Sequence, residues 1–204
     1  MNKLHCFKES GNSYKVALAL SLAGMEWQKV DVDYFGGETR SAAWRAAVNE
    51  QGEVPVLEID SRKMTQSGAI LMYLSEQVPQ FALNKEERDE VLRWVLFDNH
   101  KFTANLASYR WLRTFASPTP EEAILAFLRG RTEGALAILE KHLEHQSFVV
   151  GRRLTVADLS LAGYVFYPED ELGFDFTQDY PSIAAWMSRI AANVGWLPPY
   201  ELLK

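Results

Sequence analysis

The pattern of hydrophobic residues changes once along the chain, near residue 77, and this change constrains the fold more than any other feature of the sequence. Before it, short apolar runs typical of strands alternate with short helical patterns. After it, apolar residues recur at the three- and four-residue spacings of helices. We therefore predict an α/β domain at residues 1–78, a proline-bearing linker at 79–85 and an all-helical domain at 86–204.

The first domain is predicted to follow the order β-α-β-α-β-β-α. Strands are predicted at residues 3–7, 27–33, 54–59 and 63–65, and well-defined helices at 14–23 and 67–78. The last two strands are separated only by Asp60-Ser61, a dipeptide typical of turns, and we expect them to form a hairpin.

Capping signals divide the second domain into helices. A long helix is predicted over residues 86–115, and Thr119-Pro120-Glu121-Glu122 is predicted to open the next one, which continues to about residue 145. We expect these two helices to pack as an antiparallel pair. A capping box at Thr155–Asp158 predicts a third helix that ends at Pro168, and Pro181 predicts the start of another.

Composition excludes several classes of function. The formal net charge of the 204 residues is -6 and the basic residues are scattered, which argues against a nucleic-acid partner. No apolar run approaches the ~20 residues that cross a bilayer, and no spacing of cysteine and histidine predicts a metal site. With a single cysteine, Cys6, and no signal-peptide run, we expect a soluble cytoplasmic protein.

Three segments of the first domain have the chemistry of a binding site. Ser10-Gly11-Asn12-Ser13 opens the first helix, where free N–H groups and hydroxyls favour an anion such as a thiolate. The alternative is that these small polar residues only cap the helix. Gln66-Ser67 opens another helix and suits a carboxylate, with a plain cap again the alternative.

The third segment is Val54-Pro55, at the mouth of a strand. Proline has no N–H to donate to the ladder, and a cis peptide bond here would turn the N–H and C=O of Val54 outward. Those groups can then pair with an extended peptide as with an added strand. A trans proline at a strand edge is the alternative.

The order of these segments resembles the glutathione transferase superfamily, over the whole chain. The resemblance rests on residues 10–16, on Asn49-Glu50-Gln51-Gly52-Glu53-Val54-Pro55-Val56-Leu57, and on Gln66-Ser67-Gly68-Ala69-Ile70. In the second half, Gly151 to Asp158 is similar to the structural capping box of that family's helical domain. The resemblance implies a thioredoxin-like α/β domain followed by an all-α bundle.

The resemblance also implies a site for glutathione. Ser10 is placed against the thiol, with Asn12 as its competitor and Ser13 beside them. The remaining residues implied to bind glutathione are Glu53, Val54, Pro55, Gln66, Ser67, Arg40 and Asp98. Glu53 stands where many members carry Lys or Gln for the glycyl carboxylate, so Arg40, Trp44 and Arg45 are candidates to replace that contact, with a plain surface role as the alternative.

A partner chain and a second pocket are implied as well. Many relatives are homodimers, and Asp98 by position is the acidic residue that reaches the neighbour's γ-glutamyl amine, or else a charge on the helix face. The pocket for a small hydrophobic electrophile is expected between the domains, with Phe102, Tyr109, Arg110 and Arg113 as its lining or, alternatively, as plain core.

The implied function is a transferase that activates the glutathione thiolate for attack on an electrophile, as in detoxification, with glutathione as cosubstrate and no metal. Asn12 supports an alternative, glutathione-dependent reduction of disulfides or peroxides. Glu50 and Glu53 support another, a noncatalytic interaction protein on the same fold.

Overall fold

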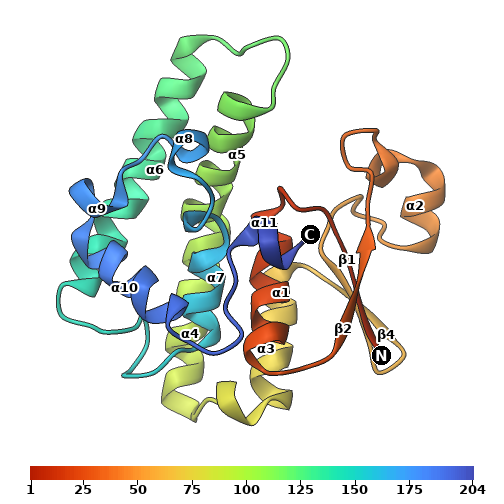
Figure 1. Cartoon of the computed structure of the whole chain (residues 1–204), viewed down its shortest axis with the longest axis horizontal. Coiled ribbons are helices and arrows are strands. Elements are labelled where there is room, and N and C mark those ends of the chain that lie inside the picture. The colour runs from red at the N-terminus through yellow and green to blue at the C-terminus, as the bar shows by residue number, and fades with distance from the viewer.

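A computed structural model describes residues 1–204, and in it an α/β part and a helical part lie side by side (Figure 1). The first part contains β1 (Asn2–Cys6), α1 (Gly11–Leu22), β2 (Trp27–Asp31), α2 (Ala42–Ala47), β3 (Val56–Ile59), β4 (Arg62–Thr65) and α3 (Ser67–Gln77). The predicted order β-α-β-α-β-β-α is confirmed. The class is also confirmed: a thioredoxin-like α/β arrangement followed by helices.

The sheet has the strand order β2-β1-β3-β4. Strands β1 and β2 run parallel, whereas β3 is antiparallel to both β1 and β4, with Leu4 opposite Leu57. Leu4 and Leu57 are fully buried in the core that includes α1 and α3. On the other face, Trp44 of α2 packs with Val32 and Val56. Both faces of the sheet are therefore covered, which leaves its edges and strand ends to form a site.

The helical part is built from α4 (Lys85–Phe97), α5 (Thr103–Thr114), α6 (Glu122–Leu143), α7 (Val156–Val165), α8 (Glu169–Leu172), α9 (Phe176–Asp179), α10 (Pro181–Ala191) and α11 (Pro199–Leu202). A π-helical turn at Asp98–Phe102 joins α4 to α5, so the helix predicted over 86–115 is locally underwound by this turn. Short 3-10 turns occupy Glu38–Arg40 and Pro79–Phe81.

The predicted start of the second long helix at Thr119 is wrong. The first helical hydrogen bonds of α6 go to the Glu121 carbonyl, so Thr119 and Pro120 belong to the loop and the side chain of Glu121 makes no cap. The cap-like residues were compatible with an earlier start, but the position of a helix end depends on packing as well as on local signals. The starts at Thr155 and Pro181 are confirmed.

Helix α7 runs through the middle of the molecule against α1, and every one of its residues is buried. Its capping box is confirmed: Asp158 accepts the N–H of Thr155 at 2.8 Å and, on its other oxygen, the N–H of Val149 at 2.8 Å and the indole N–H of Trp186 at 2.9 Å. Burial raises the pKa of Asp158, and these donors oppose the rise. The box therefore ties the start of α7 to the preceding loop and to α10.

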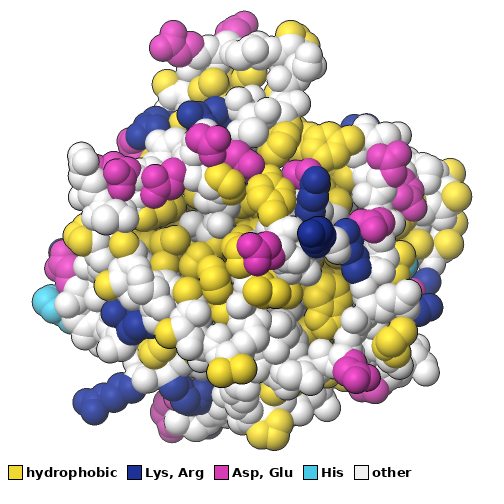
Figure 2. Space-filling view, in the orientation of Figure 1, with side chains coloured by type: hydrophobic (Ala, Val, Ile, Leu, Met, Phe, Trp, Pro, Cys, Tyr) yellow, Lys and Arg dark blue, Asp and Glu magenta, His cyan; other side chains and the backbone are white.

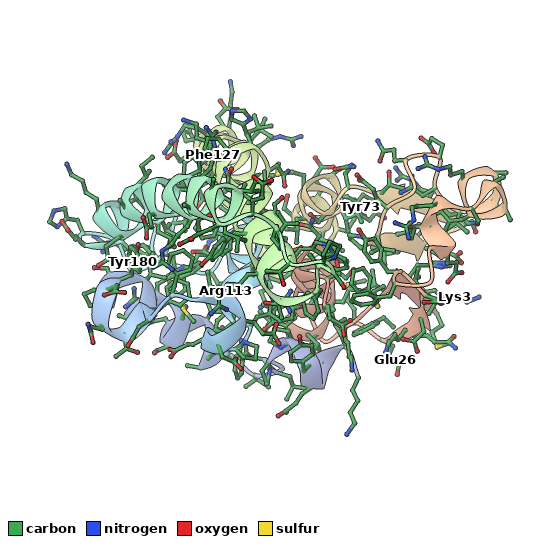
Figure 3. All side chains as sticks on the ribbon, turned by 90° about the horizontal axis from the view of Figure 1, so that it is seen from above. Lys3, Glu26, Tyr73, Arg113, Phe127 and Tyr180 are labelled. Carbon is green, nitrogen blue, oxygen red and sulfur yellow. The ribbon has the colours of Figure 1, made fainter.

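One hydrophobic core crosses from the α/β part into the helical part. Hydrophobic side chains also gather on the visible surface where the two parts meet (Figure 2). Seen from above, Phe127, Arg113 and Tyr180 lie on the helical half, and Lys3 and Glu26 lie on the sheet half (Figure 3). No helix has the length and apolar character needed to cross a membrane.

Candidate functional site

A cavity of about 490 Å³ opens where the start of α1 faces α5 and α7. The α/β part contributes Phe7, Glu9, Ser10, Asn12, Tyr34, Gly52, Glu53 and Val54 to its wall. The helical part contributes Ala107, Ser108, Arg110, Trp111, Leu112 and Tyr164. Its position between two parts of the chain, with both apolar and polar walls, is typical of a small-molecule site.

Ser10 is the N-cap of α1 and is 5% exposed. Its hydroxyl oxygen accepts hydrogen bonds from the N–H of Ser13 at 3.1 Å and from the Ser13 hydroxyl at 3.0 Å. An oxygen that accepts two hydrogen bonds keeps its own proton free, and here the proton is available to a group in the cavity. The Ser10 hydroxyl is therefore a hydrogen-bond donor whose position is fixed by Ser13.

Ser13 has a different position from the one predicted. It is fully buried and does not line the cavity, because α1 turns its side chain back onto Ser10. The prediction that Ser13 contacts the ligand directly is wrong, and its contact with Ser10 makes it a supporting residue.

Asn12 lines both this cavity and a smaller one of about 40 Å³ beside it. Its side-chain carbonyl oxygen accepts the Ser67 hydroxyl at 3.4 Å, so the amide NH2 is free to donate. Asn12 thus lies between the starts of α1 and α3, in reach of both ends of the site.

The Val54–Pro55 peptide bond is cis, as predicted. Neither the N–H nor the C=O of Val54 makes a backbone hydrogen bond, and Val54 lines both cavities. Pro55 itself is buried. An extended peptide backbone can pair with Val54 as with a strand edge.

The smaller cavity is formed by Asn12, Glu53, Val54, Pro55, Gln66, Ser67 and Asn99. Gln66 has a positive φ of 66° and donates its amide to Gln51 at 2.9 Å and to the Glu53 carboxylate at 3.0 Å. Ser67 is 6% exposed at the first position of α3, where N–H groups are free. The side chain of Glu53 is therefore held on the Gln66 side of the site.

Asn99 was missed by the sequence analysis. It follows Asp98 in the π-helical turn, and a Cβ built on Gly68 would lie 2.7 Å from its side-chain nitrogen. A π-turn contains one residue more per turn than an α-helix, so it shifts which side chains share a face. The polar residues next to the predicted Asp98 were the only sequence signal for it.

The prediction for Asp98 is wrong. Its side chain is fully buried and accepts from the Lys15 ammonium at 2.6 Å, the Thr103 hydroxyl at 2.6 Å and the Ser160 hydroxyl at 2.5 Å. A carboxylate with these partners does not reach a neighbouring chain. Burial lowers the pKa of Lys15, and the charge of Asp98 opposes that shift. The ion pair instead fastens α1 to the helical part.

Arg40 lines neither cavity: it is exposed and lies over Gly37. The role of Arg40 in ligand binding stays a prediction, and the structure places it at the end of an exposed 3-10 turn. Arg45 donates to the Glu50 carbonyl at 2.8 Å, and Trp44 is buried in the small core under α2.

Of the four residues predicted to face an electrophile, only Arg110 lines the cavity. Phe102 is fully buried, and Tyr109 packs on Phe174. Arg113 bonds to the carbonyl of Asp170. Phe102 and Tyr109 therefore belong to the helical core, which was the alternative interpretation, whereas Arg113 is exposed.

The neighbouring face of α5 forms the wall of the cavity instead. Trp111 stacks on Phe35 with ring centroids 5.1 Å apart and contacts Tyr34 edge to face at 5.4 Å. Tyr34 in turn stacks on Phe7 at 4.4 Å. Phe7, Tyr34 and Trp111 line the cavity as an aromatic wall that joins the α/β part to α5, and Phe35 packs on Trp111 without lining the cavity.

Arg110 is 2% exposed and fully engaged by protein groups. Its Nε donates to Glu171 at 2.9 Å, Nη1 to the Glu9 carbonyl at 2.8 Å and Nη2 to the Tyr200 hydroxyl at 3.0 Å. The guanidinium also lies 3.7 Å from the ring centroid of Tyr167. Its charge is therefore balanced within the protein.

Two family descriptions cover most of the chain. Residues 2–76 match the glutathione S-transferase N-terminal domain, and residues 102–193 match the C-terminal domain. A maleylacetoacetate isomerase from Pseudomonas aeruginosa is 31% identical over 82% of this chain and 81% of its own.

Comparison with solved structures agrees with these sequence matches. The chain is similar to a glutathione S-transferase from Pseudomonas fluorescens, with a TM-score of 0.88, 33% identity and coverage of 97% of this chain and 98% of that one. It has the same fold as Ure2p in complex with glutathione, with a TM-score of 0.85, 19% identity and coverage of 100% and 97%. The arrangement of the α/β part, the cis bond before Pro55 and these matches together show that this chain belongs to the glutathione S-transferase superfamily.

Proposed function

We propose that this protein is a glutathione transferase that conjugates glutathione to small hydrophobic electrophiles. One observation carries the proposal: the free hydroxyl proton of Ser10 faces a cavity whose rim also offers the unpaired backbone of Val54 and the start of α3 at Ser67. These three features match the thiol, the cysteinyl backbone and the γ-glutamyl carboxylate of glutathione.

In the proposed pose, the cysteinyl N–H and C=O pair with Val54. The γ-glutamyl carboxylate accepts from Ser67 and the free N–H groups of α3. The γ-glutamyl ammonium lies near the carboxylate of Glu53, which Gln66 holds on that side, and near the side-chain oxygen of Asn99. Glu53 then contributes to binding at this end rather than opposing the glycyl carboxylate.

The reaction begins when the thiol of bound glutathione releases its proton to solvent. A thiol with a pKa near 8.5 is only a few per cent ionised at neutral pH, and a donor such as Ser10 favours the thiolate. The sulfur electron pair then forms a bond to the electrophilic carbon. With a halogenated aromatic, the carbon–halogen bond breaks and the halide leaves with its electron pair. The aromatic wall formed by Phe7, Tyr34 and Trp111 is suited to a flat substrate.

Activity assays test the proposal. Purified protein with saturating glutathione is expected to accelerate conjugation of a halogenated aromatic, an enone or an isothiocyanate. Ser10→Ala is expected to lower kcat/KM by about 10- to 100-fold, the value of one charge-assisted hydrogen bond. Ser188→Ala on the exposed side of α10 is the matched control and should keep full activity. A rate equal to background across the whole panel would show the proposal to be wrong.

A second candidate is glutathione-dependent reduction of disulfides, favoured by the position of Asn12 between both cavities. If Asn12 is the thiol donor, Asn12→Ala should reduce turnover of hydroxyethyl disulfide more than Ser10→Ala does. Because the Pseudomonas aeruginosa relative is named an isomerase, isomerisation should also be assayed, with a cis-configured enone as the substrate.

The noncatalytic alternative makes a different prediction. The amide of Gln66 is already bonded to Gln51 and Glu53, so a ligand must compete for it. Calorimetry that detects no glutathione binding would favour an interaction protein.

We also propose the homodimer that is common among relatives. Leu92 and Leu96 of α4 are 42% and 58% exposed, a surface that a second copy would cover. Light scattering at micromolar concentration measures the mass directly, and the mass of a monomer would contradict the proposed homodimer.

A further inference from the structure

Tyr164 reaches from α7 of the helical part to the first turn of α1. It lines the same cavity as Ser10 and Asn12 and is 7% exposed. A Cβ built on Gly11 would lie 2.5 Å from both Cδ2 and Cε2 of the Tyr164 ring. The ring therefore lies directly on the helix terminus that carries Ser10.

The phenol oxygen faces the open end of α1. Backbone hydrogen bonding from Asn12 and Gly11 opposes the rise that burial causes in its pKa, so the oxygen lies beside the free N–H groups of the helix start. Because the oxygen accepts on this side, its own proton points away from the helix. Burial raises the pKa of Tyr164 to about 12, so the hydroxyl stays protonated at neutral pH.

The neighbouring groups do not take this proton. Arg110 of α5 is the nearest cation and is paired with Glu171, and Asp98 is occupied by Lys15. Tyr167, just beyond the end of α7, donates its hydroxyl to the Lys8 carbonyl at 2.8 Å, whereas the Tyr164 hydroxyl has no such acceptor in the protein. An O–H without an acceptor, nine-tenths buried on a cavity wall, is positioned to serve a ligand.

We propose that Tyr164 is a second catalytic residue, which donates its hydroxyl to the sulfur of bound glutathione from the side opposite Ser10. This inference rests on the proposed function. The phenol proton is shared and not transferred: the sulfur proton goes to solvent, and the sulfur electron pair goes to the carbon of the electrophile. The free helix N–H groups act on the thiolate through the phenol, which they polarise.

The arrangement makes the helical part a direct contributor to thiolate formation. Ser10 comes from the α/β part and Tyr164 from α7, so the two donors meet only when α1 and α7 are packed together. We expect each donor to lower the pKa of the glutathione thiol independently.

The test measures the pKa of the bound thiol by ultraviolet difference absorbance of the thiolate across a pH series. Tyr164→Phe keeps the ring that packs on Gly11 and removes only the hydroxyl. Losing one charge-assisted hydrogen bond is expected to raise the thiol pKa by about one unit. The variant should therefore lose up to about 10-fold in conjugation rate below the wild-type thiol pKa, and recover the wild-type rate once the pH exceeds the raised pKa.

Tyr167→Phe is the matched control, because it removes a phenol hydroxyl just beyond the end of α7 that bonds to a backbone carbonyl and does not line the cavity. It should leave the thiol pKa unchanged while lowering thermal stability. If Tyr164→Phe does not fold, 3-fluorotyrosine at position 164 keeps the shape and strengthens the donor, and the thiol pKa should then fall.

The outcomes separate the two proposals. Wild-type protein that binds no glutathione in calorimetry overturns the proposed function and this inference together. Wild-type protein that binds glutathione, with the same thiol pKa in Tyr164→Phe as in the wild type, overturns the role of Tyr164 alone. A higher thiol pKa in Tyr164→Phe than in the wild type supports the role of Tyr164. A merely structural role would change the stability of the protein and leave the thiol pKa unchanged.

Discussion

Cys6 ends strand β1 a short distance before Ser10, yet its thiol is sealed in the core. It is fully buried, and burial raises its pKa to about 12. Because only the thiolate is a strong nucleophile, Cys6 takes no part in chemistry at the cavity. Cys6 lies in the core at the end of β1, whereas Ser10 lies at the cavity at the start of α1. The loop between the two elements therefore separates a core position from a site position.

This environment gives a prediction for Cys6. Iodoacetamide at pH 8 should label it at a negligible rate in the folded protein and rapidly in denaturant. Between the unfolded thiol pKa of about 8.5 and the raised folded value, the unfolded chain loses a proton that the folded chain keeps. Stability contributed by the buried thiol is therefore complete below that window and declines as the pH rises through it. Fast labelling of native protein would contradict the prediction.

Single residues also show which parts of the site could be predicted from the sequence. Ser10, Asn12, Val54, Gln66 and Ser67 all line a cavity as expected, because each belongs to a local motif at a strand or helix end. Asp98 and Phe102 do not, because their surroundings depend on how a helix is rotated. Periodicity identifies a buried stripe but not which neighbour buries it.

At the scale of elements, α1 and α7 meet through two glycines. A Cβ on Gly11 would lie 2.6 Å from the Gly163 carbonyl oxygen, and a Cβ on Gly163 would lie 2.9 Å from the Gly11 carbonyl oxygen. Neither distance is possible for real atoms, so both positions must lack a side chain for the helices to approach this closely. Gly11 falls in the segment predicted to open the first helix and Gly163 in the helix predicted from Thr155, but no sequence pattern indicates that they touch.

Gly11→Ala should therefore separate α1 from α7. We expect a loss of about 1–3 kcal/mol in the free energy of unfolding, the usual cost of overpacking, together with a lower affinity for glutathione. Gly130→Ala is the control, because nothing lies within 4 Å of its added Cβ on the exposed side of α6. There, alanine should stabilise the helix by about 0.5–1 kcal/mol. Denaturant titration measures both variants, and equal effects would refute the close contact.

The π-helical turn at Asp98–Phe102 accounts for what the helical pattern could not predict. The sequence indicates one continuous helix there, and the chain does remain helical throughout. The extra residue of the turn brings Asn99 to the smaller cavity and leaves Asp98 in the core. Such a turn depends on tertiary contacts, here the ion pair between Asp98 and Lys15, which no local pattern encodes.

At the scale of the whole molecule, Arg110 joins segments that are distant in the sequence. Its guanidinium connects the loop at Glu9, helix α8 at Glu171 and helix α11 at Tyr200. The resemblance indicated a position near the electrophile, and Arg110 does line the cavity. Its role as a crosslink could not be predicted, because it depends on the packing of three short segments.

Arg110→Met should lower the free energy of unfolding by about 3–5 kcal/mol, since it leaves Glu171 largely buried without its cation. Arg88→Met removes an exposed ion pair with Glu76 and should cost less than about 1 kcal/mol. Thermal or denaturant unfolding compares the two, and a loss in Arg110→Met as small as in Arg88→Met would contradict the crosslink.

Two hydrogen-bond partners of α1 come from the C-terminal end of the chain. Tyr14 donates to the Leu197 carbonyl at 2.9 Å, and Ser21 donates to the Gly195 carbonyl at 2.5 Å. During synthesis, α1 is made long before Gly195 and Leu197. One side of α1 therefore stays uncovered until the C-terminal residues have been made. Contacts of such long sequence separation form late in folding. The binding site at the start of α1 is therefore among the last parts of the newly synthesised chain to reach its final structure.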